Sequence, residues 1–300
     1  MKGIRSNLIL IFFCCCFLSA CDVSIGYGSQ SSPTVLPAAA TFEPTLSPIP
    51  SPTITPTAQP TALPTPLPCF NAGGVVERIM IPSVELEKGL YVTIYIPPCY
   101  DPKRKYPVLY LLHGQAMTDR FWVDLGVTQI ADHAIQNGQA PFMIVMPFEE
   151  RNFDPMLETK FGDSMIKELI PFVDKFYATC TQRTCRAIGG VSRGGGWAIR
   201  LGMRNFDLFG AIGGHSFALP EIDNWWPIHQ LESHAVEEFP RIYIDRGDQD
   251  YLCAGIDDYE KLLTFTKIPH EYHTAPGTHG VAYWQLHVQE YMDFYMAGWQ

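Results

Sequence analysis

A serine between glycines is the residue of this sequence that most directly suggests chemistry. The spacing Gly-x-Ser-x-Gly occurs at Gly190, Ser192 and Gly194, after an apolar run at 186–191 and before a helical pattern. A serine at such a strand-to-helix turn holds its Oγ at the edge of a sheet, and small neighbours let the strand and the helix pack closely. We predict that Ser192 is a nucleophile. The alternative is a glycine-rich turn with a structural serine.

A serine hydroxyl attacks well only when a base takes its proton and an acid orients that base. Seven histidines follow Ser192, and only His279 falls in a loop after the last expected strand. We therefore predict His279 as the general base. The expected strand at 241–245 leads into Arg-Gly-Asp-Gln-Asp, where the spacing Gly-x-x-Asp favours Asp250 as the orienting acid. Asp248 is the alternative acid, and a solvated turn is the alternative role of either residue.

Acyl transfer also needs two donors for the negative oxygen that develops on the carbonyl. One donor is expected to be the backbone N–H of Arg193, the residue after the nucleophile. The other should come from the loop after the apolar run at 108–112, which reads His-Gly-Gln, and we assign it to the N–H of Gln115. His113 is expected to hold this loop in place.

Aromatic side chains are candidates for lining a substrate pocket. The segment around 225–226 lies between expected strands, where a lid or a substrate platform would sit. Ordinary core or surface packing is the alternative for each ring. The candidates are Trp122, Trp197, Phe217, Trp225 and Trp226.

The elements that would position these residues alternate between strands and helices. Strands are expected at 75–82, 90–96, 108–112, 142–146, 186–191, 209–213, 241–245 and 270–274. Helices are expected at 128–137, 164–177, 193–203, 256–266 and 282–297. This alternation predicts the α/β class, with a mostly parallel sheet covered by helices on both faces. In such a sheet the site lies at the carboxyl ends of the strands, where the residues above would meet.

The N-terminus predicts export and a lipid anchor. Lys2 and Arg5 precede an apolar run at 8–18, which is too short to span a bilayer. The run ends in Leu-Ser-Ala-Cys, which resembles the lipobox of bacterial lipoproteins, a family in which the cysteine is lipidated. Residues 1–20 are thus predicted to be a lipoprotein signal peptide and Cys21 the lipidated first residue. An ordinary cleaved signal peptide is the alternative.

A tether is expected between this anchor and the folded part. Residues 33–68 hold 11 of the 25 prolines, eight threonines and one charged residue, and cannot bury enough apolar surface to fold. We therefore divide the chain into the signal at 1–20, a lipidated, disordered tether at 21–68 and one α/β domain at 69–300. This domain would face outside the cytoplasm, at the cell surface or in the periplasm.

Charge excludes one class of partner. The four charges of the first 68 residues cancel, so the net charge of −10 falls on 69–300. An acidic domain is unsuited to binding a nucleic-acid backbone. The sequence does not indicate the oligomeric state.

Cysteine usage fits an oxidising compartment. Cys180 and Cys185 enclose four residues between an expected helix and an expected strand, and we predict a disulfide between them. Cys69 and Cys99 are a plausible second pair, which leaves Cys253 over. No Cys-x-x-Cys pair supports a zinc site in this domain, and we predict no metal.

Several segments of the domain resemble the esterase D / enterochelin-esterase-like family of α/β-hydrolases. The resemblance covers 75–298 and implies an α/β-hydrolase fold in which Ser192, Asp250 and His279 are nucleophile, acid and base. Arg193 departs from the family, which often has Met after the serine; its side chain could add charge near the site or point away. The segments are Leu-Leu-His-Gly at 111–114, Glu-Leu-Ile-Pro-Phe at 168–172, Gly-Gly-Val-Ser-Arg-Gly-Gly at 189–195, Gly-Asp-Gln-Asp at 247–250 and Gly-Thr-His at 277–279.

The predicted function is ester hydrolysis through an acyl-enzyme, without a metal or organic cofactor. The resembling family includes siderophore esterases, feruloyl and acetyl xylan esterases, S-formylglutathione hydrolases and mycolyltransferases. Export favours an acylated polysaccharide or another extracellular ester over a cytosolic thioester, and an acidic domain does not favour anionic siderophores. An acyltransferase with the same triad and a non-catalytic envelope-binding lipoprotein are the alternatives. Product analysis with and without an acceptor alcohol separates the first of these from hydrolysis.

Overall fold

The computed structural model of the chain describes residues 68–299. The expected signal peptide, Cys21 and the tether before residue 68 lie outside the described residues, so these assignments stay predictions. No helix within 68–299 is long and apolar enough to cross a membrane.

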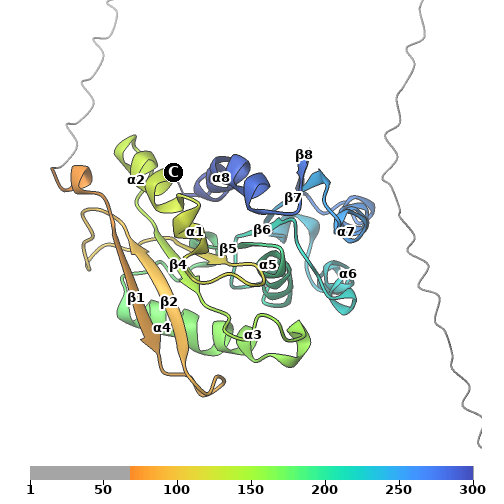
Figure 1. The fold of residues 1–300 in the computed structure, drawn as a ribbon, viewed down its shortest axis with the longest axis horizontal. Coiled ribbons are helices and arrows are strands. Elements are labelled where there is room, and N and C mark those ends of the chain that lie inside the picture. Colours follow the sequence, from red (N-terminus) through yellow and green to blue (C-terminus); the bar gives the residue numbers. More distant parts are fainter. Residues whose placement is uncertain (1–67, 300) are drawn as a thin grey trace, which may run out of the picture. The chain divides into compact units, whose positions relative to one another are not determined.

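An eight-stranded, mostly parallel sheet forms the centre of the domain (Figure 1). Its spatial order is β1-β2-β4-β3-β5-β6-β7-β8. The pairs β1–β2 and β2–β4 are antiparallel and the other neighbouring pairs are parallel. The strands are β1 (Val75–Ile81), β2 (Leu90–Ile96), β3 (Val108–Leu112), β4 (Met143–Pro147), β5 (Arg186–Val191), β6 (Ala211–His215), β7 (Arg241–Gln249) and β8 (Glu271–Thr278).

Helices cover both faces of this sheet, because side chains alternate along each buried strand. In β3, Leu109 and Leu111 pack on one face, and Val108, Tyr110 and Leu112 pack on the other. The first face is covered by α1 (Phe121–Asp124), α2 (Val127–Gln136) and α8 (Val281–Met296). The second is covered by α3 (Phe161–Ser164), α4 (Ile170–Phe176), α5 (Arg193–Arg204) and α7 (Cys253–Phe265), with α6 (Trp226–Leu231) beside α5.

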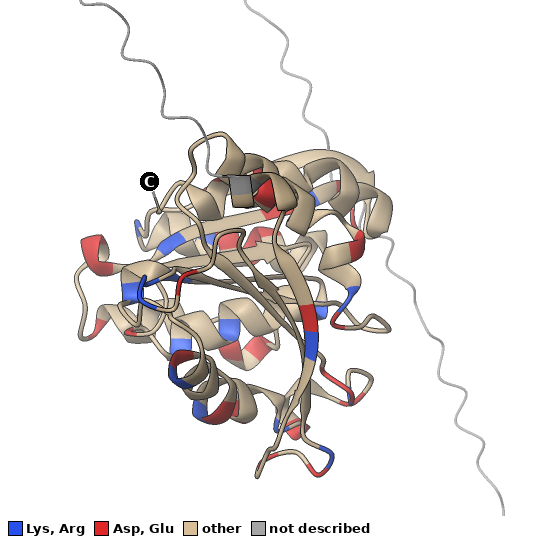
Figure 2. Cartoon of the chain, turned by 90° about the vertical axis from the view of Figure 1, so that its left-hand side faces the viewer, with Lys and Arg blue, Asp and Glu red and all other residues tan. Residues whose placement is uncertain are grey.

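This arrangement is an α/β-hydrolase fold and confirms the predicted class. Figure 2 shows charged residues mainly on the helices and loops around the sheet, while the central strands are largely uncharged. Strands β3 and β4 are buried along their whole length, which explains why their sequences are uninterrupted apolar runs.

The helix expected at 164–177 differs from the prediction in its geometry. It begins earlier, at Phe161, and contains a π-helical turn at Met165–Leu169 before α4. Pro171 stands in the first turn of α4 and has no N–H to donate to a carbonyl one turn back. The Ile170 N–H instead donates to the Met165 carbonyl, which is the wider spacing of a π turn.

Strands β7 and β8 are longer than their apolar patterns predict. The strands were predicted to end at residues 245 and 274. In the structure, pairing runs on from Arg246–Thr274 through Gly247–Ala275 to Gln249–Thr278. The register shifts between Gly247 and Gln249. The two strands therefore end side by side, immediately before Asp250 and His279.

Two disulfides lie in the described domain and confirm the predicted pairs. Cys69 pairs with Cys99, and Cys180 pairs with Cys185. Neither bridge includes Cys253.

Candidate active site

Ser192 stands at a sharp turn between β5 and α5. Its backbone has φ 52° and ψ −120°, a conformation that non-glycine residues rarely adopt. A Cβ at Gly190 would lie 2.4 Å from the Gly194 carbonyl carbon, and a Cβ at Gly194 would lie 2.2 Å from the Leu112 carbonyl oxygen. Both flanking positions of the Gly-x-Ser-x-Gly pattern are thus restricted to glycine by backbone contacts.

Ser192, His279 and Asp250 form a continuous hydrogen-bonded chain. His279 Nε2 lies 2.9 Å from Ser192 Oγ, and His279 Nδ1 lies 3.0 Å from each oxygen of the Asp250 carboxylate. When Nδ1 carries its proton toward Asp250, Nε2 is left to accept the serine proton. The arrangement can therefore generate a serine nucleophile at the carboxyl edge of the sheet.

The geometry distinguishes the two candidate acids. Asp250 is buried, and its Oδ1 also accepts the Leu252 N–H at 2.8 Å. Burial acts to raise the pKa of Asp250, but the hydrogen bonds from His279 and Leu252 outweigh it and hold this pKa below its ordinary value. Asp248 instead accepts the Gly277 N–H at 2.9 Å and ties β7 to β8. Asp250 is thus the carboxylate in contact with His279 and the candidate for orienting it.

The two expected oxyanion donors lie in segments close to the serine. Arg193 is the first residue of α5, and Gln115 follows Gly114, where an added Cβ would lie 3.4 Å from Ser192 Cβ. Neither the Gln115 nor the Arg193 backbone N–H donates to an acceptor among residues 68–299. Both amides are therefore available to an oxygen bound beside Ser192, and their role stays a prediction.

His113 connects the loop after β3 to the loop after β4. Its Nδ1 lies 2.7 Å from the Gly114 carbonyl oxygen, and its Nε2 accepts the Glu149 backbone N–H at 3.0 Å. A ring that donates from Nδ1 and accepts at Nε2 is neutral. Burial lowers the pKa of His113 from its ordinary 6.5. The expected role of His113 in holding the loop agrees with these contacts.

This lowered pKa predicts a loss of stability in mild acid. Below about pH 6.5 the unfolded chain binds a proton at His113 that the folded chain binds less readily, so protons favour unfolding. The stability that neutral His113 contributes to the fold is fully present above about pH 6.5 and is lost as the pH falls below it. We expect Tm to drop less between pH 7.5 and pH 5.5 in His113→Gln, whose amide oxygen can still accept the Glu149 N–H, than in the wild type. Equal drops would show that His113 does not contribute.

The side chain of Arg193 is held by Glu149. Its guanidinium forms a two-point contact with the buried Glu149 carboxylate, at 2.7 and 2.6 Å. The guanidinium is therefore paired with the Glu149 carboxylate. Glu149 itself was not identified from the sequence. Its position just past the end of β4, at the same sheet edge as the triad, is the signal that could have found it.

A second polar cluster, around His215, contacts the serine turn through the backbone. It was not identified from the sequence. The His215 carbonyl accepts the Ser192 N–H at 2.8 Å. The buried His215 ring lies between Asp245, at 2.8 Å, and the Tyr295 hydroxyl, at 2.9 Å. Tyr283 and Tyr291 donate to the other oxygen of Asp245. Each oxygen of this buried carboxyl group thus has a partner, as a buried polar group requires.

Three of the five aromatic candidates are packed into the core. The Trp122 N–H donates to the Leu112 carbonyl at 3.1 Å, and the Trp197 N–H donates to Glu149 at 3.0 Å. The structure therefore corrects the prediction for Trp122, because its buried indole N–H lies on an internal acceptor rather than on a ligand. Trp197 is buried as well, but it lines the larger cavity described below. Phe217 is also buried, although it borders a cavity described below. Trp225 is exposed, whereas Trp226 packs under the Arg204 guanidinium at 4.5 Å.

A cavity of about 250 Å³ lies beside the triad. Tyr251, on its wall, follows Asp250 and places its ring 4.6 Å from the His279 ring. Ala218, also on the wall, donates its N–H to the Ser192 carbonyl at 3.0 Å. The lining residues are Phe217, Ala218, Leu219, Asn224, Tyr251, Leu252 and Gly255.

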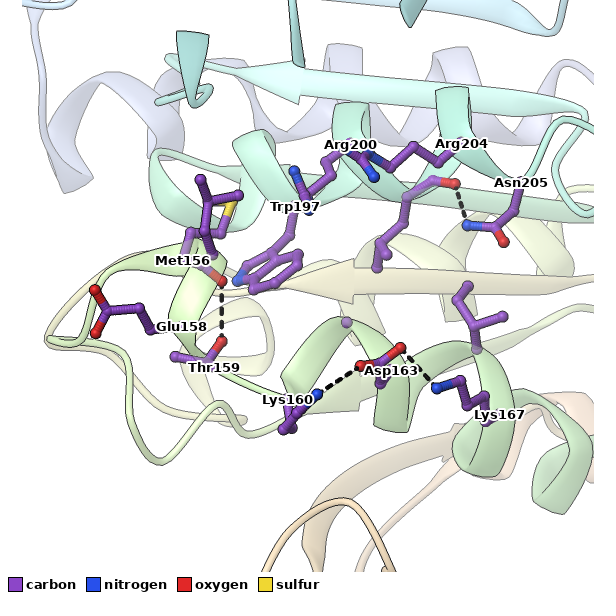
Figure 3. Close-up of a pocket in the computed structure, with 14 residues that line it drawn as sticks. Met156, Glu158, Thr159, Lys160, Asp163, Lys167, Trp197, Arg200, Arg204 and Asn205 are labelled. Carbon is purple, nitrogen blue, oxygen red and sulfur yellow. Dashed lines mark hydrogen bonds and ion pairs between the residues drawn. The ribbon is translucent and has the colours of Figure 1, made fainter. Parts of the chain in front are cut away.

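A larger cavity of about 350 Å³ runs between α3 and α5 (Figure 3). Trp197, Arg200 and Arg204 of α5 and Asn205 just after it line one side of the cavity. Lys160, Asp163 and Lys167 form ion pairs on the other side. None of its lining residues belongs to the triad or carries an expected oxyanion donor. Tyr251 and Ala218 on the wall of the smaller cavity contact His279 and Ser192, whereas no lining residue of the larger cavity makes a described contact with either, so the smaller cavity is the candidate for holding part of a substrate at Ser192.

Comparison with known proteins gives a family match over most of the domain. The sequence pattern of the family described as "Putative esterase" matches residues 83–293. The chain is 32% identical over 140 residues to endo-1,4-beta-xylanase Y of Acetivibrio thermocellus, covering 42% of this chain and 12% of that protein. It is 29% identical over 153 residues to an endo-1,4-beta-xylanase/feruloyl esterase of Xylanibacter ruminicola, covering 47% of this chain and 21% of that protein. The chain thus spans about a fifth or less of these two relatives.

A solved structure described as a ferulic acid esterase is similar in fold. It superposes with a TM-score of 0.67 at 24% identity, over 76% of this chain and 98% of that one. Its likeness supports the α/β-hydrolase architecture described above.

Proposed function

Because the chain belongs to the family described as "Putative esterase", a family of carboxylic ester hydrolases, we propose that it hydrolyses esters with Ser192 as the nucleophile. The hydrogen-bonded chain from Ser192 through His279 to Asp250 carries this proposal. It supplies the three groups that serine-dependent ester hydrolysis requires, in contact and in the order of proton transfer.

The geometry supports a two-step reaction. His279 Nε2 takes the Ser192 proton as Oγ attacks the ester carbonyl carbon, and the Gln115 and Arg193 amides receive the negative oxygen. The protonated His279 then gives its proton to the leaving alcohol, and the carbon–oxygen bond to that alcohol breaks. Water repeats the sequence on the acyl-enzyme, releasing the acid and restoring the Ser192 hydroxyl.

For the substrate, we propose an ester of an aromatic acid carried on a polysaccharide. The cavity beside the triad is lined mainly by apolar side chains, including Phe217 and Leu219, with the Tyr251 ring at its edge, and such a wall suits a flat ring. Two relatives whose names include xylanase, one of them also a feruloyl esterase, point in the same direction. The net charge of −10 makes an anionic siderophore a poor alternative.

We further propose that the enzyme acts outside the cytoplasm, anchored through Cys21. The Leu-Ser-Ala-Cys segment that ends at Cys21 is one support. The other is the pair of disulfides in the domain, because disulfides persist in oxidising compartments and are rare in the cytosol.

Substrate preference tests this proposal. We expect kcat/KM for a feruloylated arabinoxylan oligosaccharide to exceed that for S-formylglutathione by at least about 10-fold, because the cavity wall binds the ring. Tyr251→Ala should raise KM for the feruloyl ester by about 5- to 10-fold, since a packed aromatic contact is lost. Released acid and thiol are measured by chromatography. Nitrophenyl acetate, whose acyl group carries no ring, is the matched control substrate. A preference for S-formylglutathione would contradict the proposed substrate class.

A further inference from the structure

A buried ion pair joins the residue after Ser192 to the loop that follows β4. The Arg193 guanidinium donates from Nε to Glu149 Oε2 at 2.7 Å and from Nη2 to Oε1 at 2.6 Å. The two side chains are 12% and 3% exposed. A parallel two-point contact of this kind fixes the plane of the guanidinium as well as its position. Because Arg193 is also the first residue of α5, Glu149 fastens the start of the helix whose N–H is one oxyanion donor.

The same loop fastens the segment that carries the other donor. The Glu149 backbone N–H donates to His113 Nε2 at 3.0 Å, and Asn152 Oδ1 accepts the Ala116 N–H at 2.9 Å. Asn152 Nδ2 in turn donates to the Glu149 carbonyl at 2.9 Å. Gln115 therefore lies between His113 and Ala116, which are both fastened to the loop after β4.

The Glu149 carboxylate neutralises the positive charge of the Arg193 side chain. Both oxygens of Glu149 are taken by the guanidinium, and Oε2 also accepts the Trp197 N–H at 3.0 Å. The guanidinium is thus engaged with Glu149 through Nε and Nη2. Its influence on the reaction comes through the position of the Arg193 backbone.

We propose that Glu149 is a positioning residue, which sets the separation of the Gln115 and Arg193 N–H groups across the oxyanion site. This inference rests on the proposed esterase function. A donor contributes to catalysis when it meets the oxygen of the transition state, so a small displacement weakens that contact. The substrate in its ground state is held mainly by other contacts. Loss of Glu149 should therefore lower kcat and leave KM nearly unchanged.

The test is Glu149→Gln in the full chain, with nitrophenyl acetate as substrate. We expect kcat to fall by about 10- to 100-fold, while KM stays within about twofold. Arg193→Met breaks the same contact from the other side and is expected to have a similar effect. If Glu149→Gln fails to fold, Arg193→Met tests the proposal in its place. The double variant should lose no more than the larger single loss, because both single changes remove one shared interaction.

Asp223→Asn is the matched control. Asp223 is a buried carboxylate that pairs with Arg200 and Arg204 of α5, the helix that begins at Arg193. It makes none of the described contacts with the loop after β4. It should lower Tm but leave kcat at the wild-type value. A folded Glu149→Gln enzyme with wild-type kcat, or additive losses in the double variant, would overturn the positioning role and leave the esterase function standing. A wild-type chain that cleaves no ester would overturn both.

Discussion

Ser192→Ala removes ester hydrolysis, with kcat falling by about 10⁶-fold, the size of loss seen when the nucleophile of a serine triad is deleted. The substitution takes away the Oγ that lies 2.9 Å from His279 Nε2. It leaves the turn itself intact, because alanine places the same Cβ on the same backbone. Initial rates with nitrophenyl acetate, measured beside the wild type, give the loss.

Thermal unfolding is the control for this variant, and Tm should stay within a few degrees of the wild type. Activity that survives in a folded Ser192→Ala chain would show that another group, or water activated directly by His279, attacks the ester. A chain that loses both activity and its cooperative unfolding would show that Ser192 is needed for the fold.

Asp250→Asn is expected to lower kcat by about 10⁴-fold. The asparagine amide would donate toward His279 Nδ1 and so favour the tautomer with its proton on Nε2, the nitrogen that must receive the serine proton. The fold should tolerate the change, because the remaining amide oxygen can still accept the Leu252 N–H. The quantity to measure is kcat across pH 6 to 9.

Asp248→Asn is the control for this second prediction. Asp248 lies two residues earlier on the same strand end and accepts the Gly277 N–H, a contact that an asparagine oxygen can keep. Its kcat should remain within about twofold of the wild type. A large loss in Asp248→Asn together with a small one in Asp250→Asn would exchange the roles assigned to the two residues.

The choice between these two carboxylates shows where sequence reasoning ends. Their spacing is two residues, so a regular strand would point both to the same face. In the structure, β7 continues to Gln249 and its register against β8 shifts after Gly247. This irregularity separates Asp248, which ties β7 to β8, from Asp250, which meets His279. The apolar pattern of the strand ends at Ile244 and contains no sign of the shift.

Other parts of the site could be predicted because local sequence requires them. Gly190 and Gly194 are needed wherever a strand turns sharply into a helix, and a base placed after the last strand must lie at the same sheet edge. The pair of Arg193 and Glu149 is different. It joins residues 44 positions apart, and no local pattern matches a partner to a charge over that distance.

The sequence also did not separate the aromatic candidates that pack in the core from those that border a cavity, for a related reason. Residue type predicts that a tryptophan carries a large apolar surface, but it does not predict whether that surface faces a ligand or the core. Trp122 and Trp197 lie in the core, with their N–H groups on Leu112 and Glu149. Tyr251, which packs on His279 and is 75% exposed, was not among the candidates.

The most direct test of the central claim is the covalent labelling of Ser192 by a fluorophosphonate, which reacts with an activated serine. The full chain is incubated with the reagent, its intact mass is measured, and the modified peptide is sequenced by fragmentation. We predict one adduct per chain, on Ser192, and no adduct in Ser192→Ala. An adduct on another residue, or unchanged labelling of Ser192→Ala, would contradict the assignment of Ser192 as the nucleophile.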